Sequence, residues 1–229
     1  MPLWTSDADL FALCRRELFT AVVGDVLDKL GCLRQFLPPQ IRPLAPQMVA
    51  IGRAMTVLEA DCFAESSPGP GPLMQKPFGL MLEALDDLKQ DEIYVCAGAS
   101  PRYALWGELM SIRAQTLGAA GAVCDGYSRD TSGIVELGFP TFSYGPYAQD
   151  QGPRGKVIDF RCPLEIQGVR IQPGDIVFGD VDGVLVIPKE AETDAFSMAL
   201  EKARGEKTVR KAIENGMPAA EAFAKFGIM

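Results

Sequence analysis

The amino-acid sequence predicts a mixed α/β fold in one domain. Between residues 78 and 144, apolar runs of strand length alternate with segments of helical periodicity, which is typical of parallel strands joined by helices. Short β-type segments separated by Gly and Pro turns follow, and helical segments stand at both ends of the chain. At 229 residues, of which 48% are hydrophobic, the chain can bury one substantial core, so a single domain over 1–229 is expected.

The first part of the chain is predicted to hold one helix and one strand. Leucines and valines recur at helical spacing over 6–31, and Gly31 is a stop signal. A proline-rich stretch then leads to an alternating segment, 52–59, which predicts a strand. Residues 66–77 are rich in Pro and Gly and predict a long loop, which is either a cover over a site or a surface excursion.

The middle of the chain carries the regular alternation. We expect helices over 78–89 and 107–117, strands over 92–97, 122–125 and 141–144, and a short helix before the last of these strands. Loops that leave the carboxyl ends of parallel strands lie at the same edge of the sheet, where ligands of α/β proteins usually bind. The residues that follow these strands are therefore the first candidates for a site.

The last part of the chain changes character after a Gly- and Pro-rich loop over 145–155. Short segments at 156–161, 165–171 and 175–187 predict strands, with turn signals at Pro173-Gly174-Asp175 and Asp182-Gly183. A charged helix is expected from 189 to 215, and a shorter one is expected to end near 226.

Charge and composition exclude several classes of function. Lys and Arg number 22 against 30 Asp and Glu, so the net charge of −8 has the wrong sign for a protein that binds nucleic acid. Asp7 and Asp9 stand where a signal peptide would need basic and apolar residues, and no apolar run is long enough to span a membrane. Six separated cysteines without a C-x-x-C pair predict buried, reduced thiols, as for Cys124. We expect a cytoplasmic protein without a membrane or nucleic-acid partner.

The sequence contains no histidine, and this limits the available chemistry. Ser-His-Asp and Cys-His catalysis, His-ligated zinc and a histidine general base are all excluded. Carboxylate, Lys or Cys chemistry remains, as does a hard cation such as Mg²⁺ or Mn²⁺ held by oxygen ligands. A negatively charged protein binds an anion only by gathering a few positive groups or a cation at one place.

The candidate site residues lie within 106–145. Gly107 and Glu108 open a predicted helix. The first N–H groups of this helix, at Leu109 and Met110, lack intrahelical acceptors, so they can bind a carboxylate. Arg129 and Asp130 follow the predicted strand 122–125 and can converge with Glu108 at the sheet edge. Two simpler explanations stay open: Glu108 stabilises the helix dipole, and Arg129 with Asp130 forms an exposed ion pair.

This pattern resembles a known family. Glu108, then 20 residues, then Arg129-Asp130 is similar to the signature of the 4-hydroxy-4-methyl-2-oxoglutarate / 4-carboxy-4-hydroxy-2-oxoadipate aldolases, which share a fold with the regulator of ribonuclease E activity A (RraA). The resemblance also includes TAVVGDVLDKLG (20–31), GRAMTV (52–57) and PGDIVFGDVDGVLVIP (173–188), in the expected order. In one departure, the family usually has Asp where this chain has Glu108, which is longer by one methylene.

The resemblance implies a fold, a set of roles and an assembly. The fold would be a three-layer β/β/α sandwich resembling a swivelling domain, assembled as a homotrimer or homohexamer with the terminal helices at subunit interfaces. Asp130 would bind Mg²⁺ or Mn²⁺ directly and Glu108 would reach it through water. Arg129 would grip the substrate carboxylate, and Gly107, Leu109 and Met110 would face the 2-oxo acid.

The implied activity is a divalent-metal-dependent retro-aldol cleavage of a 4-hydroxy-2-oxo dicarboxylic or tricarboxylic acid, which releases pyruvate. Oxaloacetate decarboxylation would be a side activity because it passes through the same enolate. The main alternative is a non-catalytic regulator that acts by protein contact, as RraA does. A Schiff-base aldolase would need one of the nine lysines, none of which lies within 106–145, and a methyltransferase would need a Gly-rich nucleotide loop that we do not find.

Overall fold

The computed structural model describes residues 3–62 and 71–228. Backbone contacts divide the chain into two compact units, one formed by 34–189 and the other by 1–33 together with 190–229. We describe each unit by itself, and the expectation of a single domain stays a prediction. The larger unit contains every candidate site residue.

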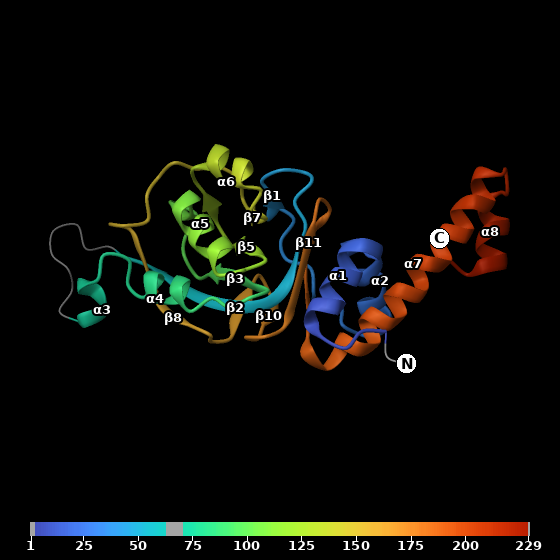
Figure 1. Ribbon diagram of the computed structural model, residues 1–229, viewed down its shortest axis with the longest axis horizontal. Helices are drawn as coiled ribbons and strands as arrows, with labels where there is room; N and C mark the ends of the chain where they lie inside the picture. Colours follow the sequence, from blue (N-terminus) through green and yellow to red (C-terminus); the bar gives the residue numbers. More distant parts are fainter. Residues whose placement is uncertain (1–2, 63–70, 229) are drawn as a thin grey trace. The chain divides into compact units, whose positions relative to one another are not determined.

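The larger unit is built on one curved sheet, and the long strand β2 (Ala50–Asp61) lies at its centre (Figure 1). The order across the sheet is β1 (Arg42–Pro43), β7 (Thr141–Ser143), β5 (Gly121–Cys124), β3 (Glu92–Ala97), β2, β11 (Ile176–Asp180) and β12 (Gly183–Ile187). Strands β2, β3, β5 and β7 are parallel, whereas β11 and β8 (Gly155–Phe160) both pair antiparallel with β2. The predicted parallel sheet is confirmed, and its loops after β3, β5 and β7 share one edge.

Three layers make up the larger unit. On one face of the sheet, helices α4 (Met81–Asp86), α5 (Glu108–Thr116) and α6 (Thr131–Leu137) pack over an apolar core that includes Met55, Tyr94 and Trp106. On the other face, the hairpin of β9 (Leu164–Ile166) and β10 (Val169–Ile171) covers a second core with Ala54 and Val95. Figure 1 shows α5 and α6 on the opposite side of the sheet from β10. The predicted α/β sandwich is therefore confirmed.

The smaller unit consists of helices. It contains α1 (Asp7–Glu17), α2 (Thr20–Lys29), α7 (Glu192–Glu214) and α8 (Ala219–Phe226), and a short 3₁₀ turn, Lys189–Ala191, precedes α7. Ser6 caps α1 by accepting a hydrogen bond from the Asp9 backbone at 3.1 Å. Ion pairs from Arg204 to Glu17 and from Lys202 to Asp25 join α7 to the first two helices.

The single helix predicted over 6–31 is wrong, because the chain is extended at Leu18 and Phe19. The two extended residues redirect the backbone, so each of the resulting helices buries its own apolar face. The predicted helix over 78–89 is also too long. Residues Phe78 and Leu80 instead exchange backbone hydrogen bonds with Val157 of β8, and this pairing delays the helix until Met81.

Other parts of the chain agree more closely. The expected strands at 156–161, 165–171 and 175–187 appear as β8, the β9–β10 hairpin and the β11–β12 hairpin. The six cysteines are free, and Cys14, Cys96 and Cys124 are buried. Of the predicted loop 66–77, residues 66–70 lie outside the described residues and the rest includes the short helix α3 (Pro72–Gln75). No helix in the described ranges is long and apolar enough to cross a membrane.

Candidate active site

A short pair of parallel strands brings the predicted residues together. Strand β4 (Ala104–Trp106) pairs with β6 (Tyr127–Ser128), and the Arg129 backbone donates a hydrogen bond to the Trp106 carbonyl at 2.9 Å. The chain therefore leaves both strands at the same point, toward Glu108 in one case and Asp130 in the other. This explains how an acid and an Arg-Asp pair separated by 20 residues become neighbours.

Helix α5 begins at Glu108, directly after the extended residue Gly107. Its first intrahelical bond runs from the Ser111 N–H to the Gly107 carbonyl at 3.1 Å, and the N-cap residue, Gly107, has no side chain that could cap the helix. The N–H groups of Leu109 and Met110 are consequently donors without an intrahelical acceptor, as predicted. A buried clamp fixes this turn: the Trp106 indole donates to the Ser111 hydroxyl at 2.7 Å, which in turn donates to the Gly107 carbonyl.

Two glycines allow close approach of the acidic side chains. A Cβ atom at Gly107 would lie 2.9 Å from Oδ2 of Asp130, and this oxygen is 3.4 Å from the Glu108 backbone nitrogen. A Cβ atom at Gly133 of α6 would lie 2.3 Å from the carboxyl carbon of Glu108. The Glu108 carboxylate thus rests against α6, and the Asp130 carboxylate rests against the start of α5.

Arg129 is held by two carboxylates. Its Nη1 donates to Asp150 at 2.6 Å, and its Nε lies 3.5 Å from Oδ2 of Asp130. Asp150, which also accepts from the Gly152 backbone at 2.9 Å, was not among the predicted site residues. The polar run of residues 149–151 within the loop after β7 was a usable signal, because that loop leaves the same sheet edge as the loops after β3 and β5.

A pocket of about 370 Å³ lies beside these residues. Its wall includes the predicted residues Gly107, Leu109, Met110, Arg129 and Asp130, together with Asp150, Gln151 and a mainly apolar group: Phe78, Met81, Leu82, Leu85, Ala104, Leu105 and Trp106. A second hollow of about 390 Å³ lies against Arg129, Asp130 and Tyr147. An apolar pocket with a few converging polar groups is typical of a small-molecule site.

The charges of this site suit a cation together with an anion. The carboxylates of Asp130 and Asp150 pair with the Arg129 guanidinium, and Glu108 stands in the first turn of the adjoining helix, so an anionic ligand would meet a net negative site unless a cation came with it. Within residues 3–62 and 71–228, no three Asp, Glu, Cys or His side chains are grouped closely enough to hold a metal ion by themselves. Mg²⁺ often binds through one or two carboxylates and keeps several waters, and that donor set fits Asp130 and Glu108.

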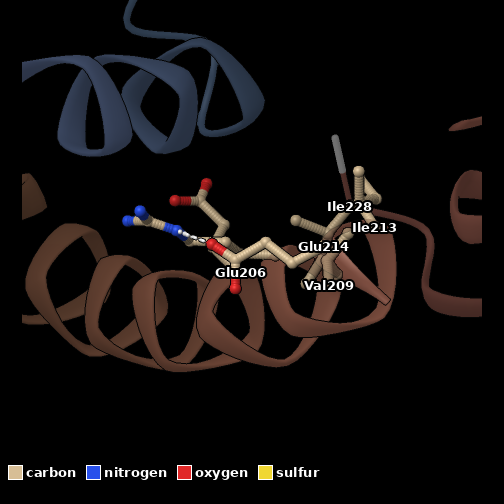
Figure 2. Close-up of a pocket in the computed structure, with 6 residues that line it drawn as sticks. Glu206, Val209, Ile213, Glu214 and Ile228 are labelled. Atoms are coloured by element: carbon tan, nitrogen blue, oxygen red, sulfur yellow. Dashed lines mark hydrogen bonds and ion pairs between the residues drawn. The ribbon is translucent and has the colours of Figure 1, made fainter. Parts of the chain in front are cut away.

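A further pocket, of about 320 Å³, lies along the C-terminal half of α7 in the smaller unit, against Ile228, which follows α8 (Figure 2). Val209, Ile213 and Ile228 give it an apolar lining, and Arg210 pairs with Glu214 at 2.8 Å. Among the described residues, the titratable side chains in its wall are Glu206 and this exposed pair. It offers no group of polar residues comparable to those around Arg129.

Comparisons with known proteins agree with this architecture. A protein of Halalkalibacterium halodurans named "Putative 4-hydroxy-4-methyl-2-oxoglutarate aldolase" is 30% identical over 214 residues, which cover 91% of this chain and 90% of that protein. An uncharacterized protein from Pseudomonas syringae pv. tomato has a similar crystal structure, with a TM-score of 0.82, 25% identity and coverage of 99% and 98% of the two chains.

A third similar structure is Streptomyces coelicolor RraAS2, described as an unusual member of the RNase ES inhibitor RraA protein family. It has a TM-score of 0.76 and 22% identity, and the match covers 91% of this chain and 99% of that one. At this identity the likeness shows the fold alone. The sequence also matches the RraA-like family, described as Aldolase/RraA, over residues 20–186. Because that match spans most of the chain and the folds agree, the protein belongs to the RraA-like family.

Proposed function

We propose that this protein is a divalent-metal-dependent lyase that cleaves a 4-hydroxy-2-oxo acid to pyruvate and a second carbonyl compound. The observation that carries the proposal is the meeting of Glu108, Arg129 and Asp130 beside the open first turn of α5. The family relative named as an aldolase supports the same activity. The expected small substrate is an anionic 2-oxo acid.

Arg129 is the group we propose for binding the substrate carboxylate. Its Nε lies against Asp130 and its Nη1 donates to Asp150, whereas Nη2 makes no hydrogen bond to any described residue. This Nη2 can donate a charge-assisted hydrogen bond to a carboxylate. The free N–H groups of Leu109 and Met110 supply additional donors at the positive end of α5.

Asp130 would bind Mg²⁺ or Mn²⁺ directly, and Glu108 would reach the ion through water. When bound, the ion would supply positive charge at the 2-oxo group, where negative charge develops during cleavage.

The bond changes can be written without assigning every proton to a residue. The C4 hydroxyl loses its proton, C4 becomes a carbonyl carbon as the C3–C4 bond breaks, and the electron pair moves into the 2-oxo group to give a pyruvate enolate. Protonation at C3 then yields pyruvate. We propose that Glu108 holds the proton from the hydroxyl, directly or through water, because it stands in the first turn of α5 and its carboxylate lies beside Gly133 of α6. Oxaloacetate decarboxylation would yield the same enolate.

The test is a screen of 4-hydroxy-2-oxo acids and oxaloacetate for pyruvate release. Purified protein would be treated exhaustively with EDTA, assayed, and assayed again after addition of Mg²⁺ or Mn²⁺. We expect activity only with added metal. Activity at full strength in protein shown to be metal-free would contradict the metal role, and no pyruvate from any substrate would favour a regulator that acts by protein contact.

A further inference from the structure

A buried carboxyl group lies behind the wall of the site. Glu59 stands on β2 and is only 2% exposed, among the apolar residues of the core beneath the helices. Its Oε2 accepts a hydrogen bond of 2.6 Å from the side-chain amide of Gln151. Its other oxygen, Oε1, has no hydrogen-bond partner in the described part of the chain. No step of the proposed reaction uses this residue.

The contacts lead from Glu59 to the site in three steps. Gln151 is 4% exposed and lines the mainly apolar pocket of about 370 Å³, and its neighbour Asp150 lines the same pocket. Asp150 then accepts the 2.6 Å hydrogen bond from Nη1 of Arg129. The bond from Gln151 to Glu59 is thus the side-chain link between the central strand of the sheet and the segment that orients the guanidinium.

Stability alone does not explain a carboxyl group at this position. Burial raises the pKa of Glu59 to about 8, although the hydrogen bond from Gln151 acts in the opposite direction. Its neighbours on the same face of the sheet, including Met55, Val57 and Tyr94, are core residues, so an apolar side chain would avoid the desolvation cost. A polar group that is costly to bury and is bonded to a pocket residue indicates a role in the site.

We propose that Glu59 is a positioning residue, which holds Gln151 and thereby places Asp150 so that it orients the guanidinium of Arg129. The consequence for substrate binding rests on the proposed function, since there Arg129 receives the substrate carboxylate. The consequence for the arginine itself does not depend on it. Glu59 touches neither the pocket nor a reacting group and is not a catalytic residue.

The direct test observes the Arg129 side chain by NMR. The Nε–H resonance of Arg129 would be assigned by its loss in Arg129→Lys, and Asp150→Ala would show its position when the guanidinium is released. In Glu59→Leu, which removes the acceptor of Gln151, we expect the resonance to move toward the Asp150→Ala position or to broaden. In Glu59→Gln, which keeps an acceptor oxygen, it should stay near the wild-type position. An unchanged resonance in Glu59→Leu would overturn the proposal.

A second variant and a kinetic assay extend the test. If Glu59→Leu does not fold, Gln151→Met breaks the same hydrogen bond from the loop side and should move the resonance in the same way. In the pyruvate-release assay, Glu59→Leu should raise KM by roughly tenfold, because a misoriented Arg129 would lose its charge-assisted hydrogen bond to the substrate carboxylate. The value of kcat should be much less affected. Glu59→Gln should restore KM.

The two proposals fail separately. If the wild-type protein releases no pyruvate from any 2-oxo acid, the proposed function is wrong, while the Arg129 resonance still tests the positioning role. If turnover is found and KM rises equally in Glu59→Leu and Glu59→Gln, or does not change in either, the link to substrate binding is wrong.

Discussion

Arg129 and Asp130 are adjacent in the sequence, but the proposed site assigns them different ligands. Arg129→Lys keeps the charge and loses the planar fork, so we expect KM for the 2-oxo acid to rise roughly tenfold or more while metal affinity stays nearly constant. Asp130→Asn removes an anionic ligand, so metal affinity should fall first and turnover with it. Titration calorimetry with Mn²⁺ and steady-state kinetics measure the two effects separately.

An exposed ion pair on the same face provides matched controls. Arg113 of α5 pairs with Asp86 at 2.7 Å, away from the pocket wall. Arg113→Lys and Asp86→Asn change the same chemical groups and should leave KM and metal affinity at wild-type values. If Arg129→Lys and Asp130→Asn behave like these controls, then Arg129 and Asp130 form only a surface ion pair.

Gly133 offers a test in which stability and activity should change in opposite directions. Alanine favours a helix interior by about 1 kcal/mol relative to glycine, so Gly133→Ala should not destabilise α6. Its Cβ would occupy the place of the Glu108 carboxyl group, which can swing away because it ends a flexible side chain. We expect a melting temperature at or above wild type and a kcat lowered by roughly tenfold or more. Unchanged kcat in Gly133→Ala would mean that the position of the Glu108 carboxylate is unimportant, and Ser132→Ala serves as the control.

Glu59 should make stability depend on pH in a defined direction. Burial raises the pKa of Glu59 to about 8 in the folded protein, so between about pH 4.5 and 8 the folded state binds more protons than the unfolded state. The stabilising contribution is complete below the unfolded value and is lost as the pH rises through the folded value. The loss would be of the order of several kcal/mol.

The measurement compares wild type with Glu59→Gln by urea unfolding between pH 5.5 and 8.5. The free energy of unfolding of the wild type should fall relative to the variant as the pH rises. Tyr94, Cys96 and Tyr103 interact electrostatically with Glu59, but their pKa values are raised, so they stay neutral over this range. Parallel stability curves for the two proteins would show that Glu59 keeps an ordinary pKa.

At the scale of the elements, regular strands and helices were predictable where local pattern and packing agree. Strand β3 has the predicted bounds, because a run of apolar residues buried on both faces needs no distant partner to be recognised. The break at Leu18 and Phe19 was not predictable, since the apolar spacing continues through it and only packing of the two helices requires the turn. Local preference is overridden by tertiary contacts at such points.

The short strands that bring the site residues together, β4 and β6, were not predicted from the sequence. Strands β4 and β6 contain only Ala104–Trp106 and Tyr127–Ser128, too few residues for a periodic pattern. Their pairing nevertheless brings the predicted Glu108 and Arg129 together. Asp150 and Gln151 lie in a Gly- and Pro-rich loop whose path is set by distant backbone bonds, such as that from Ala104 to Gln149 at 2.8 Å. Convergence at the sheet edge was predictable from topology, and the polar run 149–151 pointed to the third loop, but which of its side chains contacts Arg129 was not predictable.

The buried clamp at the start of α5 should matter for stability. Ser111→Ala would leave the Trp106 indole N–H without its acceptor inside the core, which typically costs about 1–3 kcal/mol. We expect the free energy of unfolding measured in urea to fall by this amount. Ser132→Ala, at an exposed position of α6, should be nearly neutral. Equal stability of the two variants would mean that another acceptor replaces Ser111.

At the scale of the whole molecule, assembly stays a prediction. Helix α8 buries only Ala222 and leaves Phe223 56% exposed, an apolar side chain that a second copy of the chain would cover. We expect a homotrimer or homohexamer by light scattering at micromolar concentration, and a shift toward smaller species in Phe223→Asp. Lys225→Ala on the same helix is the control. A monomer with full activity would contradict both the assembly and sites shared between subunits.

The two tryptophans lie in different units of the protein, Trp4 in the helical unit and Trp106 in the sheet unit. Trp4 makes an edge-on contact with Phe196 of α7, while Trp106 is enclosed by Tyr94 and Phe139 in the core beside the pocket. Each unit therefore carries its own intrinsic fluorophore. Proteins with Trp4→Phe or Trp106→Phe would each emit from one unit, so denaturation followed by fluorescence can record whether the units melt in one transition or in two.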